Sequence, residues 1–374
     1  MLRSALSLRV PVHVDVRFRQ LGVGLVEVMI GLLIGMIALL VMLQMLSSSE
    51  GQKRTTLGAD DAQNTGAIAL YSLQRDLKQA GHGISERRVI GCELTGFPGG
   101  ADLPVAAPVI INPPAAVVPA GDANSDTLLV MYGTAAGSSR GAEVLDPADV
   151  GTPAALKAVV TAANEVYYMW SPDVFQATDR IFVGPLLRPV GACSYALAEV
   201  GDVVVLNPGV NAPTATEGFV YNLGALPRVV AYRVDSGNLT SCDYVTQDCT
   251  NGANYEVIAN HVVSMRAQYG RDTGVGDLDG IVDLYDQTTP ASACDWLRVS
   301  AVRFVVVVRS AQVSGVVTAA APVWAGSGTH PVNLTANATW QNYRYRTFET
   351  VVPLRNNLAW PLAQTSAVEP TGCP

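Results

Sequence analysis

The sequence predicts an α+β protein, in which a long N-terminal helix spans a membrane and packs on an antiparallel, β-rich globular head. Three observations support this prediction. Residues 28–43 are entirely apolar or glycine. Leucine and alanine then recur at three- and four-residue steps up to residue 84, which is the period of an amphipathic helix. Beyond Gly91, β-branched and aromatic runs alternate with Gly, Pro, Asn and Asp, a pattern typical of strands and turns.

The apolar run is long enough to cross a bilayer. As a helix, residues 23–46 would extend about 36 Å at about 1.5 Å per residue. The basic residues that precede it outnumber the single acid, Asp15; they are Arg3, Arg9, Arg17 and Arg19. This bias predicts that the N-terminus stays in the cytoplasm and that everything after residue 46 is carried across the membrane.

A second helical segment, residues 47–84, is amphipathic. Its apolar stripe consists of Leu70, Leu73, Leu77, Ala80 and Ile84. Arg75 and Asp76 fall on other faces, so we expect the stripe to pack on a sheet. Gly81 is well placed to end the helix. One continuous helix through both segments is expected, although three glycines weaken its middle: Gly51, Gly58 and Gly66.

The rest of the chain has the pattern of strands. Eight segments carry it, at residues 126–132, 165–170, 180–184, 202–207, 228–234, 261–270, 297–310 and 343–354. No long amphipathic helix separates them, which favours an antiparallel arrangement over a parallel one. The Pro- and Ala-rich residues 98–122 predict a long loop.

Charge and cysteine content restrict the function. The formal net charge is −8, and residues 1–22 carry four arginines against one acid, so the remainder is close to −11 and a nucleic-acid partner is not expected. An even number of cysteines, six, follows that run, which favours disulfides in an oxidising compartment. Cys242 and Cys249 are the closest pair in sequence and the best candidates for a bridge.

Glu27 interrupts the start of the apolar run and needs its own explanation. A carboxylate at the middle of a bilayer costs about 2.5–3.5 kcal/mol on insertion scales, so an ion-pair partner is expected. A cleaved secretory signal peptide is the alternative interpretation of a basic leader before an apolar run. The length of the run, the absence of an A-x-A-like site after it, and Glu27 itself argue against that alternative.

The stretch "GVGLVEVMIG", residues 22–31, resembles the cleavage and methylation signature of type IV prepilins. The resemblance implies that a prepilin peptidase cuts between Gly22 and Val23, and that Val23 becomes an N-methylated terminus. It also implies that Glu27 pairs with the N-terminal ammonium of a neighbouring subunit. Gly31 and Gly35 form a small-xxx-small pair, which is a candidate for close helix packing.

Four further stretches resemble minor pilins of the PilW kind. They are "LYSLQRDLKQAGHGI" (70–84), "ANSDTLLVMYG" (123–133), "VRFVVVVRS" (302–310) and "YRYRTFETVVPLRNN" (343–357). The resemblance implies a leader at 1–22, a filament-core helix at 23–46, its amphipathic continuation at 47–84 and a periplasmic or extracellular head at 85–374. It implies a subunit that spans the inner membrane once and then enters a type IV pilus, near the tip.

The implied role is to initiate pilus assembly, and so to support adhesion and twitching motility. The implied partners are other minor pilins, the major pilin, the prepilin peptidase and the inner-membrane assembly platform. Two alternatives stay open: a type II secretion pseudopilin of the J kind, and a tip adhesin with a calcium-dependent binding head.

An acidic, Gly-containing loop, "YGRDTGVGDLDGIVDLYD" at 269–286, is the candidate calcium site. Its carboxylates are Asp272, Asp277, Asp279, Asp283 and Asp286. Calcium prefers several oxygen ligands from a flexible loop, although this stretch does not follow the EF-hand order. A solvated acidic hairpin loop is the alternative interpretation.

No enzymatic activity is expected. Residues 137–141 match G-x-S-x-G, the nucleophile elbow of hydrolases, with Ser139 as its serine. The residues that follow do not have the pattern of the helix that this motif requires. No motif brings a histidine to this serine, so the match is treated as coincidence.

Overall fold

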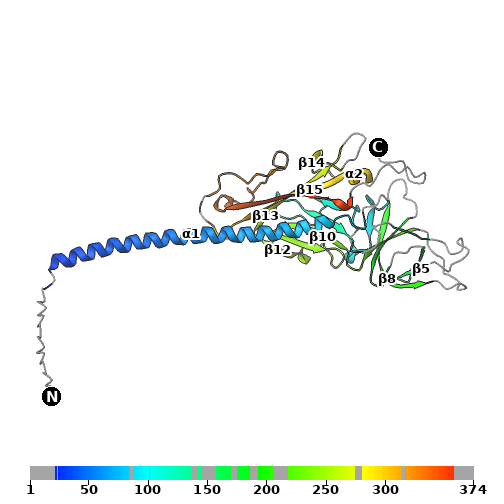
Figure 1. Ribbon diagram of the computed structural model, residues 1–374, viewed down its shortest axis with the longest axis horizontal. Coiled ribbons are helices and arrows are strands. Elements are labelled where there is room, and N and C mark those ends of the chain that lie inside the picture. Colours follow the sequence, from blue (N-terminus) through cyan, green and yellow to red (C-terminus); the bar gives the residue numbers. More distant parts are fainter. Residues whose placement is uncertain are drawn as a thin grey trace, which may run out of the picture. The chain divides into compact units, whose positions relative to one another are not determined.

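The computed structural model describes most of the chain after residue 21. The described residues are 22, 24–84, 88–100, 102–135, 141–144, 157–169, 175–185, 193–205, 218–273, 280–313, 315 and 317–357. The chain divides into two compact units, residues 1–56 and 57–374. The first contains the beginning of the long helix α1, and the second contains the end of α1 together with the β sheets (Figure 1).

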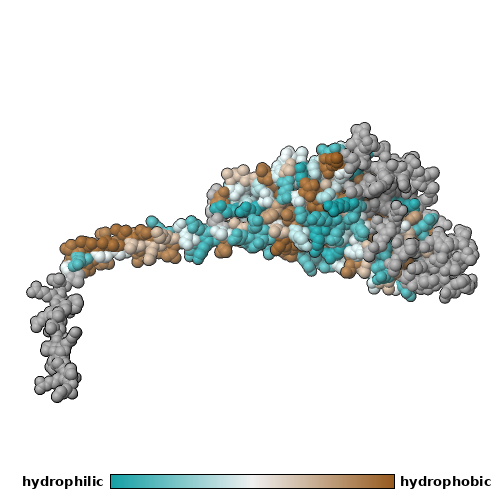
Figure 2. All heavy atoms as spheres, in the orientation of Figure 1, coloured by the Kyte–Doolittle hydropathy of each residue, from teal (hydrophilic) through white to brown (hydrophobic). Residues whose placement is uncertain are grey.

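Helix α1 runs without a break over Leu25–Gln79. In the first unit its large apolar side chains, from Leu25 to Leu46, are 46–77% exposed. Figure 2 shows them as a continuous apolar surface along the start of α1. A helix of this length and composition, exposed over so much apolar area, is a candidate membrane span. The predicted continuity through the three glycines is confirmed.

The second unit buries the end of α1. Leu73, Leu77 and Ala80 are fully buried and Ile84 is almost so, as the leucine stripe predicted. Gly81 ends the helix in the left-handed region, at φ 85°, and its N–H bonds to Met131 O at 2.9 Å. The helix therefore ends where glycine was expected to end it.

The described strands form three sheets. A seven-stranded sheet has the order β4-β9-β7-β8-β5-β6, with β1 also paired to β8; a five-stranded sheet has the order β12-β11-β10-β3-β2; a four-stranded sheet has the order β14-β13-β15-β16. Every described pairing is antiparallel except that of β1 with β8. The predicted α+β class with an antiparallel, β-rich head is thus confirmed.

The strand bounds are β1 Glu93–Thr95, β2 Val109–Ile111, β3 Leu128–Tyr132, β4 Ala142–Val144, β5 Lys157–Thr161, β6 Val166–Met169, β7 Arg180–Gly184, β8 Ser194–Val205, β9 Gly218–Gly224, β10 Arg228–Asp235, β11 Asn238–Asp243, β12 Glu256–Asn260, β13 Val262–Arg271, β14 Leu284–Asp286, β15 Val299–Arg309 and β16 Tyr345–Pro353. Each of the eight predicted segments contains or overlaps a strand. The predicted strand 297–310 starts before β15, which begins at Val299, because Leu297 ends the short helix α2, Ala293–Leu297. Ser292 starts that helix with a capping box.

The main core lies where α1, the five-stranded sheet and the four-stranded sheet meet. A buried carboxylate, Asp126, joins the two sheets: it accepts hydrogen bonds from Arg266 Nη1 and from the Ala267 N–H, both at 2.9 Å. On the four-stranded sheet, the loop after β15 covers the face opposite to α1. Trp324 and Leu334 of this loop pack on Val305 of β15.

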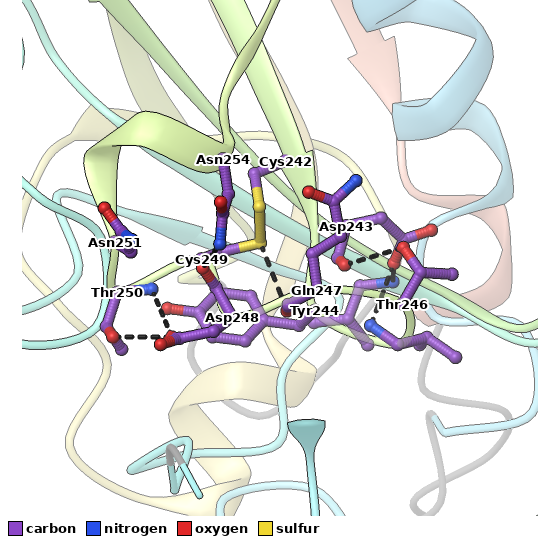
Figure 3. Close-up of a disulfide and its surroundings, with 12 residues drawn as sticks. Cys242, Asp243, Tyr244, Thr246, Gln247, Asp248, Cys249, Thr250, Asn251 and Asn254 are labelled. Atoms are coloured by element: carbon purple, nitrogen blue, oxygen red, sulfur yellow. Dashed lines mark hydrogen bonds between the residues drawn. A yellow bond between two sulfur atoms is a disulfide. The ribbon is translucent and has the colours of Figure 1, made fainter. Parts of the chain in front are cut away.

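Disulfides join parts of the head. Cys92 and Cys193 are bonded across 101 residues, next to the pairing of β1 with β8. Cys242 and Cys249 are bonded across 7 residues, and close the small loop that follows β11 (Figure 3). At the end of that loop the Asp248 carboxylate accepts hydrogen bonds from the N–H and hydroxyl of Thr250, the residue after Cys249. Cys294 is disulfide-bonded as well.

Candidate assembly site

The N-terminal signature leads into the first turn of α1. The Glu27 N–H donates to Gly24 O at 2.9 Å, and the Glu27 side chain is exposed. A carboxylate in the first turn also interacts favourably with the helix dipole. Val23, the expected methylated residue, lies outside the described residues. Gly22 is described and is exposed.

Glu27 and the two small residues share one face of the helix. Glu27, Gly31 and Gly35 follow one another at four-residue steps, which place side chains on the same side of an α-helix. A Cβ added at Gly31 or Gly35 would meet nothing within 4 Å. This face therefore presents a carboxylate and, at the two glycines, exposed backbone that another helix could approach closely.

Asp76 fixes the other end of α1 to the five-stranded sheet. Its carboxylate is fully buried and accepts hydrogen bonds from two tyrosine hydroxyls: that of Tyr232 in β10 at 2.5 Å, and that of Tyr132 in β3 at 3.1 Å. Arg75 Nε donates to the same carboxylate at 3.0 Å. Three donors thus replace the water that the buried carboxylate has lost.

This environment changes the pKa values of the tyrosines and of Arg75. Burial, and after it the charge of Asp76, raise the pKa of Tyr232 well above its usual value. The same two causes raise the pKa of Tyr132. The hydrogen bond and charge of Asp76 raise the pKa of Arg75. Both tyrosines therefore stay neutral phenols at physiological pH and donate to the Asp76 carboxylate.

The position of Asp76 corrects the sequence analysis, which placed it off the packed face of the helix. Asp76 lies next to Leu77 and three residues after Leu73, so the buried face is wider than the leucine stripe. Tyrosine hydroxyls from distant strands make its burial tolerable, and no local pattern predicts these partners. The only sequence signal was that Asp76 belongs to one of the stretches resembling minor pilins.

The last residues of the PilW-like ending hold the C-terminus of α1. Asn356 Nδ2 donates to Gln79 O at 3.1 Å and to Ala80 O at 3.3 Å, which satisfies carbonyls that have no partner within the helix. Asn357 Nδ2 donates to Trp296 O at 2.8 Å and to Val299 O at 2.9 Å. The "PLRNN" sequence thus connects two helix ends with the edge of the four-stranded sheet.

Helix α1 also packs closely on β16. Gly66 lies against the ring of Phe348, and a Cβ at this glycine would overlap the ring. Two residues before Asp76, Gln74 Nε2 donates to Thr350 Oγ1 at 2.9 Å. The end of α1 is therefore held by contacts with both the four-stranded and the five-stranded sheets.

The acidic loop is described only at its base. Asp272 is buried, and its Oδ2 accepts a hydrogen bond from the Gly280 N–H at 2.8 Å. Asp283 Oδ2 accepts one from the Thr273 N–H at 2.8 Å. Asp286 forms an ion pair with Arg271 at 3.0 Å. Asp277 and Asp279 lie outside the described residues, so calcium binding by this loop stays a prediction.

Two other expectations concern chemistry. Among the described residues, no three His, Cys, Asp or Glu side chains are grouped so that they could hold a metal ion. Ser139, the serine of the G-x-S-x-G match, lies outside the described part of the chain. The described polar contacts of this site are mainly hydrogen bonds that hold α1 on the sheets.

The fold is that of an α+β protein in which a helix long and apolar enough to cross a membrane continues into an antiparallel β head. The family model described as Type IV Pilus-assembly protein W matches residues 234–356, from the end of β10 to the turn that carries Asn356. This part of the chain is thus similar to the PilW family, as the sequence resemblance indicated. No curated protein and no solved structure matches it. The N-terminal signature lies outside the matched residues.

Proposed function

We propose that this protein is a minor pilin that helps to initiate type IV pili, in a priming complex with other minor pilins near the pilus tip. Adhesion and twitching motility would depend on it through the pili that it helps to form. The family match over residues 234–356 carries the proposal. The exposed apolar start of α1 supports it, because such a surface needs lipid or other helices to cover it.

The proposed mechanism is noncovalent. In the membrane, the peptidase would cut after Gly22, and Glu27 would pair with the ammonium of an adjacent subunit. Lipid strengthens this pairing, because a carboxylate without a partner is costly there. Gly31 and Gly35, on the same helix face as Glu27, would let the neighbouring helix approach. The Asp76 cluster would keep the head attached when α1 is drawn into the filament.

Genetic complementation tests this proposal. Deleting the gene is expected to reduce surface pili and twitching strongly, and the wild-type chain should restore both. Glu27→Gln should restore them poorly, because it keeps the size of the side chain and removes its charge. Glu50→Gln is the matched control, because Glu50 is an exposed acid of α1 beyond the apolar run and should be replaceable.

Secretion assays on the same strains separate this proposal from the pseudopilin alternative. If the protein is a pilin, deletion of its gene is expected to leave type II secretion unchanged. A deletion strain with normal pili and a defect in secretion would overturn the assignment to the pilus. Equal complementation by Glu27→Gln and the wild type would overturn the docking role of this carboxylate.

A further inference from the structure

A pocket of about 310 Å³ lies on the head, between the β10–β11 turn, the end of β15 and the loop that leads to β16. Its lining includes Arg309, Asp122, Leu334 and Trp340, together with the amides of Asn333 and Asn337. All of these except Asp122 fall within the residues matched by the family model. The pocket has no part in the helix docking described above.

Arg309 has unused hydrogen-bonding capacity in this pocket. Its guanidinium stacks on the ring of Tyr343, with the central carbon 4.5 Å from the ring centroid. Its Nε is buried and has no hydrogen-bond partner. Within the described part of the chain, no carboxylate forms an ion pair with this guanidinium. A ligand cannot reach the buried Nε, whereas the two Nη groups of Arg309, which lines the pocket, can donate to oxygens of a ligand.

The other polar groups of the pocket do not compete for Arg309. The two oxygens of Asp122 accept the N–H groups of Ser236 and Gly237, at 2.9 and 2.7 Å. The Asn333 and Asn337 side-chain oxygens accept N–H groups of their own turns, at 3.0 and 2.9 Å. Their amide nitrogens therefore remain as donors. The pocket thus offers side-chain donors, while its carboxylate and amide oxygens already accept hydrogen bonds.

We propose that this pocket binds an organic carboxylate carried on an apolar or ring-shaped body. The planar fork of Arg309 suits a planar carboxylate, and stacking on Tyr343 fixes the direction of the fork. Trp340 and Leu334 would contact the body of the ligand, and the asparagine amides would donate to its polar atoms. A singly charged group is favoured over a phosphate, because Arg309 is the only basic residue among those that line the pocket and Asp122 is close by.

Calorimetric titration of the full chain in detergent tests the proposal. N-acetylphenylalanine represents the carboxyl end of a peptide, and glucuronate represents an acidic sugar. Saturable binding of either acid, weakened at least about tenfold by Arg309→Gln, is the expected result. Whichever acid binds identifies the source of the carboxylate. N-acetylphenylalaninamide and methyl glucoside, which lack the charge, should bind at least about tenfold more weakly than the acids.

Two controls keep the test decisive. Arg346→Gln removes an exposed arginine of β16 outside the pocket and should bind like the wild type. If Arg309→Gln fails to fold, Arg309→Lys keeps the charge, loses the two-donor fork and should still weaken binding. Failure of both acids to saturate up to about 10 mM would overturn the proposal, because it places binding outside the millimolar range. Equal binding by wild type and Arg309 variants would overturn it as well.

Discussion

Asp76 attaches α1 to the five-stranded sheet. Its carboxylate is fully buried, and its partners come from β3 and β10. A buried charge with several donors contributes less net stability than its contacts suggest, since its removal from water is costly. Loss of the carboxylate is nevertheless damaging, because the hydroxyls of Tyr132 and Tyr232 would then be buried without acceptors.

Replacing Asp76 should therefore destabilise the protein strongly. We expect Asp76→Ala to lower the free energy of unfolding by about 3–5 kcal/mol. Asp76→Asn should lower it by about 1–3 kcal/mol, because one amide oxygen can still accept from a tyrosine. Urea unfolding of the full chain in detergent measures both changes. Asp61→Ala, at an exposed acid of the same helix, should lie within about 0.5 kcal/mol of wild type.

The Asp61→Ala control also defines the result that would contradict the role of Asp76. An Asp76→Ala protein as stable as the Asp61→Ala control would mean that the buried carboxylate does not hold the helix on the sheet.

At the scale of elements, the contact between α1 and β16 explains a glycine that is otherwise unfavourable in a helix. Glycine within a helix costs about 1 kcal/mol relative to alanine. Gly66 stands against the Phe348 ring, where no side chain fits without a shift of that ring. Gly58 is different, because a Cβ there would lie 3.5 Å from Ser310 Cβ, an ordinary contact distance. The same substitution should therefore have opposite effects at the two positions.

We expect Gly66→Ala to destabilise the protein by about 1–3 kcal/mol, as overpacking in a well-packed core does. Gly58→Ala should leave stability unchanged or raise it by up to about 1 kcal/mol, through higher helix propensity. Thermal unfolding followed by circular dichroism measures both. A gain of stability in Gly66→Ala would show that α1 does not approach β16 as closely as described.

Much of this arrangement of elements could be predicted from local patterns. The apolar run, the leucine stripe and Gly81 predicted the course and the end of α1, because helix periodicity and capping are properties of neighbouring residues. Long β-branched runs such as those of β13 and β15 predicted strands in the same way. The short strand β1 was missed, since it pairs with β8 about a hundred residues away, and β9 and β11 were missed as well.

The site could be predicted only in part, and for a related reason. Glu27 is conspicuous because it interrupts an apolar run, so its sequence context alone raises the question of a partner. Asp76, Asn356 and Arg309 lie in ordinary local contexts. Their roles depend on residues more than thirty positions away, and become visible only when the chain has folded. The pairing of Cys92 with Cys193 is another contact of this kind.

For the whole molecule, buried tyrosines make stability depend on alkaline pH. Burial raises the pKa of Tyr255 and of Tyr345 to about 12, and raises that of Tyr232 as well. In the unfolded chain a tyrosine ionises near pH 10. Above that pH the unfolded state binds fewer protons than the folded state, so stability is fully present below about pH 10 and falls as the pH rises.

We expect the free energy of unfolding to decrease between pH 10 and pH 11. Each such tyrosine contributes about 1 kcal/mol to the decrease over this interval. Tyr232→Phe lowers the starting stability, but should also make the decrease smaller by about 1 kcal/mol. Urea unfolding at pH 8, 10 and 11 measures both effects. The same decrease in Tyr232→Phe and wild type would contradict a raised pKa at Tyr232.

The most direct test of the pilin assignment is the mass of the protein in pili sheared from cells. Intact-mass and top-down spectrometry suit it, because no Lys or Arg lies between Val23 and Lys53 and the first tryptic peptide would be long and apolar. We expect a chain that begins at Val23 and carries a methyl group on its terminal nitrogen. Recovery only of chains that begin at Met1, or absence of the protein from the sheared pili, would contradict assembly through the N-terminal helix.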